Sequence, residues 1–225
     1  RSGADEGRFA GRMSDPIVIA IDGTSASGKS TNAKLVARKL GYVYVDTGAM
    51  YRTLAWYCLQ KGVDPADESA ISELCQDWET ELVCEEGHVR LLVDGRFPED
   101  EIRTAETSAA VSHVAAVPFV RDWMKAQQRE SVQFGSLVME GRDIGSNIFP
   151  ETPFKFYMDA SLEERQARRA ADGLQENLAA RDQRDSSRKA SPLVVSKGAV
   201  VINNSGETPE ETSGRIIAEV ERRLQ

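Results

Sequence analysis

The sequence is poor in cysteine and histidine and has no long apolar run. Its 225 residues include three cysteines and two histidines. Cys58, Cys75 and Cys84 form no C-x-x-C pair, and an odd number of thiols without a secretory signal predicts reduced thiols and a cytoplasmic location. No apolar run approaches the roughly 18 residues that cross a bilayer, so we expect no membrane association.

The chain also lacks an excess of positive charge. Its 28 lysines and arginines are outnumbered by 36 acidic residues, and the net charge of −8 argues against a general nucleic-acid binder. His88 and His113 match no nucleophile–base pattern, and we assign them no role. The length suits one α/β domain over residues 13–225, and we expect the polar, aperiodic residues 1–12 to be a disordered or artificial leader.

What the sequence does contain is a phosphate-binding loop in its usual context. Residues 17–21 are typical of a buried strand, residues 23–30 fit G-x-x-x-x-G-K-[ST], and an amphipathic helix follows to Leu40. In such a loop the N–H groups point at phosphate oxygens, Lys29 reaches the β- and γ-phosphates, and the Ser30 hydroxyl ligates Mg²⁺. The alternative is a Gly/Ser turn capped by Ser27. We predict a nucleoside triphosphate site formed by Gly23, Thr24, Ser25, Ala26, Ser27, Gly28, Lys29, Ser30 and Thr31.

Strands and helices alternate along most of the chain. Five buried strands are predicted near residues 17–21, 42–45, 136–141, 154–160 and 199–203. Helices are predicted after the first two strands, over 105–114 and 118–134, after Ser161 and after Thr208. This order predicts an α/β fold whose five-stranded parallel sheet is built by right-handed crossovers, with its core in residues 16–61 and 108–225.

Residues 62–107 interrupt this alternation. A short helix over Glu68–Asp77 is followed by two alternating runs that meet at Glu86-Gly87, a pattern typical of an antiparallel hairpin. We predict an inserted subdomain that stands over one end of the core and does not belong to the parallel sheet.

Ligands of an open parallel sheet bind beyond the carboxyl ends of its strands. That edge should bring the loop together with Asp46-Thr47, Gly141-Arg142-Asp143 and an arginine-dense segment after the fourth strand. Arginine suits bidentate phosphate recognition, although a solvated surface position is the alternative for any one of them. The arginines concerned are Arg52, Arg103, Arg142, Arg165, Arg168, Arg169, Arg181, Arg184 and Arg188. So much positive charge beside a triphosphate site favours a mobile lid.

Three aspartates at this edge have two interpretations each. Asp46 either caps the following helix or steers Mg²⁺ or a substrate hydroxyl. Asp143 either forms a plain ion pair with Arg142 or takes part in binding, and Asp185 either offsets the arginines around it or contacts substrate. No general base is evident. A nucleoside monophosphate acceptor needs none, because the second pKa of its phosphate is about 6.

Six segments in this order resemble the bacterial-type cytidylate kinases of the nucleoside monophosphate kinase family: GTSASGKST, VDTGAMYR, DEIRT, VMEGRDIGSNIFP, FKFYMDASLEERQARR and RDQRDSSR. The resemblance covers nearly everything after Met13, and EGRDIG together with RDxxDxxR is specific to the family. It implies a P-loop kinase core, a monophosphate-binding insertion over about 62–107 and a lid near 170–188. The implied reaction moves the γ-phosphoryl group of ATP to CMP or dCMP with Mg²⁺.

The resemblance also implies roles for single residues. Cytosine would be contacted by Thr47, Arg103 and Asp143, and the acceptor phosphate by Arg52, Arg142 and Arg188. Arg181 and Asp185 would bind the ribose, while Ser30 and Asp46 would lie near the metal. The residues that the resemblance assigns to catalysis are Lys29, Arg52, Arg142, Asp143 and Arg188. We expect nucleotides as partners, no nucleic acid, and a monomer.

The chain departs from the family pattern in three places. Thr24 stands where proline is usual, Pro153 follows Glu151-Thr152 where Asp-Ala is commoner, and the stretch between Arg169 and Arg181 is short, which bears on lid closure. The nearest alternative function is a kinase of the same fold that acts on UMP, AMP or an alcohol. A GTPase switch would need an N-K-x-D motif, which is missing, and a silent binding module would not need an arginine-dense lid.

Overall fold

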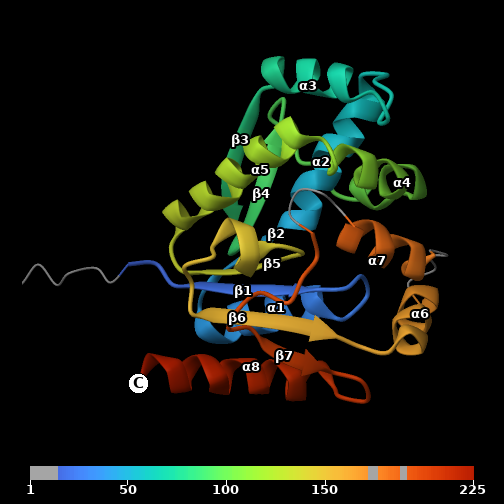
Figure 1. Cartoon of the computed structure of the whole chain (residues 1–225). Helices are drawn as coiled ribbons and strands as arrows, with labels where there is room; N and C mark the ends of the chain where they lie inside the picture. The colour runs from blue at the N-terminus through green and yellow to red at the C-terminus, as the bar shows by residue number, and fades with distance from the viewer. Residues whose placement is uncertain (1–14, 172–176, 188–191) are drawn as a thin grey trace, which may run out of the picture.

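The structure is a computed structural model, and it describes residues 15–171, 177–187 and 192–225. Within these residues a seven-stranded sheet has the order β3-β4-β2-β5-β1-β6-β7, with helices on both faces (Figure 1). The strands are β1 (Val18–Gly23), β2 (Val43–Asp46), β3 (Thr80–Glu85), β4 (His88–Val93), β5 (Leu137–Gly141), β6 (Phe154–Asp159) and β7 (Val200–Asn203). The main helices are α1 (Lys29–Leu40), α2 (Thr47–Gln60), α3 (Glu68–Asp77), α4 (Ala105–Val114), α5 (Pro118–Glu130), α6 (Leu162–Ala171), α7 (Leu178–Ser187) and α8 (Pro209–Leu224). Shorter turns are η1 (Glu101–Arg103), η2 (Ser131–Phe134) and η3 (Ile144–Ile148).

The five strands predicted from the sequence lie side by side in the order β2-β5-β1-β6-β7, and all pair in parallel. β1 lies at its centre, where Ile19 is in register with Val138 of β5 and with Phe154 of β6. All six residues of β1 are buried, as expected for a strand that is covered on both faces. The α/β class is therefore confirmed.

The hairpin of the insertion is formed as predicted, but the expectation that it stays outside the parallel sheet is wrong. β3 and β4 pair antiparallel around Glu86 and Gly87, which both have positive φ. β4 then pairs in parallel with β2, and the N–H of Tyr44 donates to the carbonyl of Gly87 at 2.8 Å. Without the hairpin, this edge of β2 would leave its backbone groups unpaired. The insertion thus extends the sheet.

The alternation of side chains in β1 divides the apolar core between the two faces of the sheet. Val18 and Ala20 belong to the cluster that packs against α2, α4 and α5. Ile19 and Ile21 belong to the cluster with residues of α1 and α8. Figure 1 shows α8 along one side of the sheet and α2, α4 and α5 on the other. Because helices cover both faces of the sheet, polar side chains that could bind a ligand are expected at the carboxyl ends of the strands.

Helix ends follow the local rules. Gly41 has φ 69° and ends α1, as its place after the apolar pattern predicts. Thr208 caps α8 in a reciprocal capping box with Glu211. None of the helices within the described residues has the length and apolar character that a membrane span requires.

Candidate active site

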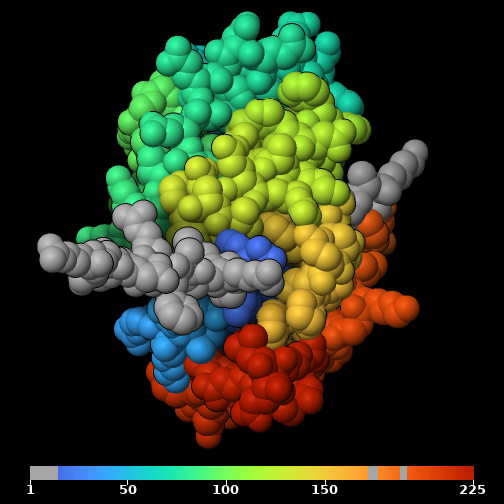
Figure 2. Space-filling model, turned by 90° about the vertical axis from the view of Figure 1, so that its left-hand side faces the viewer, coloured from blue at the N-terminus to red at the C-terminus, as the bar shows by residue number. Residues whose placement is uncertain are grey.

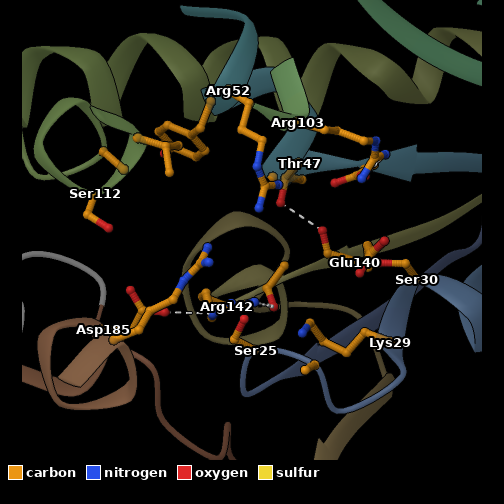
Figure 3. Close-up of a pocket in the computed structure, with 18 of the residues that line it drawn as sticks. Ser25, Lys29, Ser30, Thr47, Arg52, Arg103, Ser112, Glu140, Arg142 and Asp185 are labelled. Atoms are coloured by element: carbon orange, nitrogen blue, oxygen red, sulfur yellow. Dashed lines mark hydrogen bonds and ion pairs between the residues drawn. The ribbon is translucent and has the colours of Figure 1, made fainter. Parts of the chain in front are cut away.

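Several parallel strands end at one edge of the sheet, and a cavity of about 520 Å³ lies there. β1 leads into the phosphate-binding loop, β2 into Asp46 and Thr47, and β5 into Arg142 and Asp143. Arg168 and Arg169 of α6 and Arg181 of α7 line the other side. Figure 3 shows Asp185 of α7 next to Arg142. The expectation that these clusters share one site is confirmed for the residues that the structure describes.

The loop needs both of its motif glycines. Gly23 has φ +153°, and a Cβ there would lie 2.1 Å from the carbonyl oxygen of Met158 in β6. Gly28 adopts a left-handed conformation with φ 85° at the start of α1. Among the residues that the structure describes, no side chain caps α1. The Ser27 hydroxyl instead donates to the carbonyl of Thr24 at 3.0 Å, so the alternative in which Ser27 caps the helix is wrong.

The carbonyls of the loop accept hydrogen bonds from Lys29 at its end and from three side chains outside it. Those of Thr24 and Ser25 accept from Lys29 (2.6 Å) and Arg165 (3.2 Å), and those of Ala26 and Ser27 accept from Arg168 (3.4 Å) and Asn204 (2.9 Å). These partners come from α1, from α6 and from the residue after β7. With four successive carbonyls engaged in this way, the loop N–H groups are left for an anion.

Lys29 lies at the floor of the cavity. It is 6 % exposed, and burial together with the nearby Arg142 lowers its pKa. The bond to the Thr24 carbonyl is the kind of contact that a phosphate oxygen can replace at little cost, because both are oxygen acceptors. Lys29 therefore lines the cavity, and its contact with the β- and γ-phosphates stays a prediction.

Glu140 is a buried carboxylate of the site that sequence analysis did not select. It is the penultimate residue of β5, is 4 % exposed, and accepts a hydrogen bond from the hydroxyl of Tyr44 in β2. Burial raises the pKa of Glu140 and, together with nearby Asp46 and Glu140, that of Tyr44. Figure 3 shows Ser30 beside Glu140. A charged residue within an otherwise apolar strand was the signal available in the sequence.

The capping interpretation of Asp46 is confirmed, whereas its role toward Mg²⁺ or a substrate hydroxyl stays a prediction. One carboxylate oxygen caps α2 by accepting from the N–H of Ala49 at 2.9 Å. The other lies 3.9 Å from the guanidinium of Arg103, within the cavity. Thr47 also lines the cavity, and its hydroxyl donates to the Glu140 carbonyl at 2.7 Å.

Asp143 and Arg142 do not pair with each other, so the plain ion pair considered from the sequence is wrong. Asp143 pairs with Arg121 of α5 at 2.6 Å, with both side chains buried. Arg142 pairs with Asp185 of α7 at 2.9 Å. Adjacent residues after a strand point to different sides, so each side chain finds a partner from another helix.

Asp22 links the phosphate-binding loop to the turn that follows β5. It directly precedes Gly23, and its two carboxylate oxygens accept from the N–H groups of Ile144 and Gly145 at 2.8 Å each. Burial raises the pKa of Asp22 to about 6, although these two hydrogen bonds oppose the shift. The end of β1 is thereby linked to the residues that follow Arg142 and Asp143.

The arginines differ in how they are held. Arg52 and Arg103 both line the cavity; Arg52 is half-buried, and 61 % of the Arg103 side chain is exposed. Burial lowers the pKa of Arg52 to about 10, which leaves it a cation at neutral pH. Arg181 and Asp185 also line the cavity, whereas Arg188 lies outside the described residues.

The arginine-dense segment forms two helices. In α6, Arg165 is 7 % exposed and pairs with Asp182 of α7 at 2.6 Å, while Arg169 donates to the Ser25 hydroxyl at 3.2 Å. Within α6, Glu164 and Arg168 form an ion pair with i,i+4 spacing. The segment therefore holds the loop and pairs within itself, and it is not only a solvated face.

Further cavity residues escaped sequence analysis, among them Tyr51, Ser112 and Arg121. Arg121 offered a signal, since it falls on the buried face of α5 with Val120 and Met124. Tyr51 on α2 and Ser112 on α4 offered no such signal, because aromatic or neutral residues on a helix can belong to a binding site or to the core.

Comparisons with known proteins agree with this geometry. A model of the cytidylate kinase family matches residues 19–222. The chain belongs to the cytidylate kinase family. The cytidylate kinase of Geobacillus thermodenitrificans is 43 % identical over 223 residues, which covers 94 % of this chain and 100 % of the relative. That of Limosilactobacillus reuteri is 39 % identical over 216 residues, or 91 % of this chain and 95 % of the relative.

Membership in the cytidylate kinase family confirms the resemblance and the predicted enzyme class, a nucleotide-binding transferase that phosphorylates CMP or dCMP with ATP. Among solved structures, TT1252 from Thermus thermophilus is 22 % identical over 93 % of this chain and 98 % of that chain, with a TM-score of 0.47, a likeness too weak to add to the argument. The roles of single residues stay predictions.

Proposed function

We propose that this cytidylate kinase transfers the γ-phosphoryl group of ATP to the phosphate of CMP or dCMP by in-line displacement without a general base. The observation that carries the proposal is a single cavity that joins the phosphate-binding loop to arginines of the opposite wall. The loop suits a triphosphate, and the arginines suit a second phosphate brought up to it. In-line transfer requires that the two phosphates be held next to each other, and it requires little covalent chemistry from the protein.

The chain's own residues would position and screen the two phosphates. The loop N–H groups and Lys29 hold the triphosphate, while Arg52, Arg142 and Arg188 bind the acceptor phosphate. Their positive charge stabilises the charge that develops on the transferring group. Arg181 and Asp185 bind the ribose, and closure of the segment over 170–188 keeps water away from the γ-phosphate.

Recognition of cytosine is proposed to depend on Asp143, with Thr47 and Arg103. The ion pair with Arg121 and a 3.0 Å hydrogen bond from Asn147 orient the Asp143 carboxylate. A carboxylate accepts a hydrogen bond from the amino group of cytosine but meets a carbonyl oxygen in uracil. That mismatch leaves buried acceptors unpaired, which disfavours UMP.

Mg²⁺ fits the oxygen ligands at this edge. Ser30 is exposed at the start of α1, and Asp46 and Glu140 supply carboxylates nearby. Mg²⁺ usually binds one or two carboxylates together with substrate phosphates and waters, so a small set of protein ligands is sufficient. When bound, it would neutralise charge on the β- and γ-phosphates.

The division of the chain supports the same proposal. Residues 62–107 would form the monophosphate-binding insertion, since Arg103 at its end reaches the cavity. Residues 170–188 would form the lid, since α7 brings Arg181 and Asp185 to the cavity. A cytoplasmic location and a monomeric state stay predictions.

A panel of acceptors tests the proposal. Turnover with Mg·ATP is measured for CMP, dCMP, UMP and AMP in a coupled assay for ADP. We expect kcat/KM for CMP or dCMP to exceed that for UMP by about 100-fold or more, the range set by one unpaired buried polar group or two. Asp143→Asn should narrow this ratio, while Asp122→Asn on α5 is the control. A preference for UMP or AMP in the native enzyme would overturn the assignment.

A further inference from the structure

A second cavity of about 760 Å³ lies beside α1. We call it the α1 cavity, and define it by Lys34, Arg38, Tyr42, Tyr44, His88 and Glu210. Its walls come from α1, β2, the turn between β3 and β4, and the start of α8. It shares Ser30 and Thr31 with the catalytic cavity, so the two meet at the first turn of α1. Its volume is in the range of small-molecule sites.

Two cations face the α1 cavity without an acidic partner. Lys34 and Arg38 are exposed on successive turns of α1, and neither forms an ion pair with a carboxylate anywhere in residues 15–171, 177–187 and 192–225. Like charges four residues apart on a helix repel each other. An anion bound between them would relieve that repulsion.

The body of the α1 cavity is aromatic and apolar. Tyr44 is 4 % exposed and meets the ring of His88 edge-on, with 5.2 Å between ring centroids. The Lys34 ammonium lies 5.5 Å from the centre of the Tyr44 ring, and Tyr42 and Leu35 are half-buried along the same wall. Such a lining favours a flat organic group over a bare inorganic ion.

Acidic residues limit how much negative charge the α1 cavity accepts. The exposed carboxylates of Glu86 and Glu210 also line it. They would repel a polyanion such as a nucleoside triphosphate or a nucleic-acid strand, whereas Lys34 and Arg38 can still hold one phosphate. The chemistry therefore points to a single phosphate group carried on an aromatic body.

Tyr44 connects the α1 cavity to the catalytic cavity. Its ring forms part of the wall of the first, and its hydroxyl donates to Glu140, which lines the second. A ligand that shifts or fixes this ring would act on the carboxylate beside Ser30 and Lys29.

We propose that the α1 cavity is a second binding site, for a small aromatic phosphate monoester, and that its occupancy is transmitted to the catalytic cavity through Tyr44 and Glu140. The site is distinct from the nucleotide-binding cavity and does not depend on which monophosphate the enzyme prefers.

Phenyl phosphate is the probe that tests the site. The full chain is first saturated with CMP and ADP, which do not react with each other, so that the catalytic cavity is filled. Calorimetry or ligand-observed NMR then measures phenyl phosphate, inorganic phosphate and phenol separately. We expect saturable 1:1 binding of phenyl phosphate that is about tenfold tighter than that of either fragment, because both the anion and the ring find contacts.

Variants of α1 locate the binding. Arg38→Ala should weaken phenyl phosphate about tenfold, the effect of losing one charge-assisted contact. Lys39→Ala is the matched control, because Lys39 neighbours Arg38 on the same helix but donates to Ser213 at 3.4 Å and lies outside the cavity lining. Both variants should keep the native turnover of CMP and the native Tm.

Three results would overturn the site: no saturable binding to the filled enzyme, equal affinity for inorganic phosphate, or binding that Arg38→Ala leaves unchanged. The link to catalysis has its own readout. At saturating CMP and ATP, phenyl phosphate should change kcat of the native enzyme at least about twofold and that of Tyr44→Phe less. If kcat stays constant while binding is present, the link through Tyr44 is wrong and the site stands.

Discussion

The two sides of the catalytic cavity are held in different ways. On the triphosphate side, the carbonyls from Thr24 to Ser27 all accept hydrogen bonds from side chains. On the acceptor side, Arg52 makes no hydrogen bond to any residue that the structure describes, and Arg103 has a single 3.9 Å ion pair. The conformation of the triphosphate side is fixed by contacts within the protein, whereas the acceptor side exposes the guanidinium groups of Arg52 and Arg103 to the cavity.

This contrast shows how the two kinds of recognition are built. Backbone N–H groups become a binding site only when the loop conformation is fixed, so the protein supplies every contact that fixes it. Arginines bind phosphate through their own donors, and a strong partner in the protein would compete with the substrate. Arg142, which is also proposed for the acceptor phosphate, is the exception: it pairs with Asp185 at 2.9 Å, and this pair keeps its guanidinium within the cavity.

Removal of the central cation should have the largest effect. Lys29→Ala is expected to lower kcat by about 10³-fold or more, since it deletes the cation that reaches the transferring phosphate. The fold should survive, because the loop precedes α1 and does not fill the core. Turnover in a coupled assay and Tm by circular dichroism measure both quantities. Undiminished turnover would contradict the assignment of the triphosphate side.

Arg142→Ala tests the acceptor side. We expect kcat/KM for CMP to fall about 100-fold while KM for ATP changes less than about twofold, because the lost contacts are those to the acceptor phosphate. Arg142→Lys should recover only part of the loss, since lysine cannot donate a bidentate pair. Arg129→Ala, at an arginine whose side chain is 45 % exposed, is the control. If only ATP affinity changed, the two sides would be assigned the wrong way round.

Asn204→Ala tests whether the hydrogen bonds to the loop carbonyls are needed for ATP binding. Asn204 is 3 % exposed, and its amide donates to the Ser27 carbonyl at 2.9 Å. Loss of that bond should let the loop relax and raise KM for ATP about tenfold, the effect of leaving one buried acceptor unpaired. KM for CMP should change little. Asn203→Ala, at an exposed neighbour, is the matched control. Equal effects of both variants would show that Asn204 does not shape the loop.

Local features of this molecule could be predicted from its sequence. The loop, the five parallel strands, the Gly41 cap and the Asp46 cap all depend on residues within a few positions of each other. The clustering at the strand ends also followed, because it is a property of any open parallel sheet.

The remaining contacts connect distant residues, and no periodicity reports them. Asn204 and the Ser27 carbonyl are 177 positions apart, and Tyr44 and Glu140 are 96 apart. For Asp143, the sequence offered only its neighbour Arg142 as a candidate ion-pair partner, whereas Arg121 reaches it from α5, 22 positions earlier. Likewise, alternation identified the hairpin strands but not the strand beside which β4 would lie.

Asp22 connects the two sides of the cavity through the N–H groups of Ile144 and Gly145, and its effect is expected in stability alone. Its pKa is raised to about 6 in the folded chain, against about 3.9 when unfolded. The folded state therefore binds a proton more tightly, and the stability that this group contributes is present below about pH 4 and is lost as the pH rises to about 6. The loss is on the order of 3 kcal/mol.

Urea titrations of the native chain and of Asp22→Asn measure this loss. We expect the difference between their free energies of unfolding, native minus variant, to fall by about 3 kcal/mol between about pH 4 and about pH 6. Should the variant not fold, the carboxyl carbon of Asp22 can be titrated by NMR in the native chain. A midpoint near pH 4 would show that the hydrogen bonds from the N–H groups of Ile144 and Gly145 cancel the effect of burial on the pKa of Asp22, and that this carboxylate is already charged well below neutral pH.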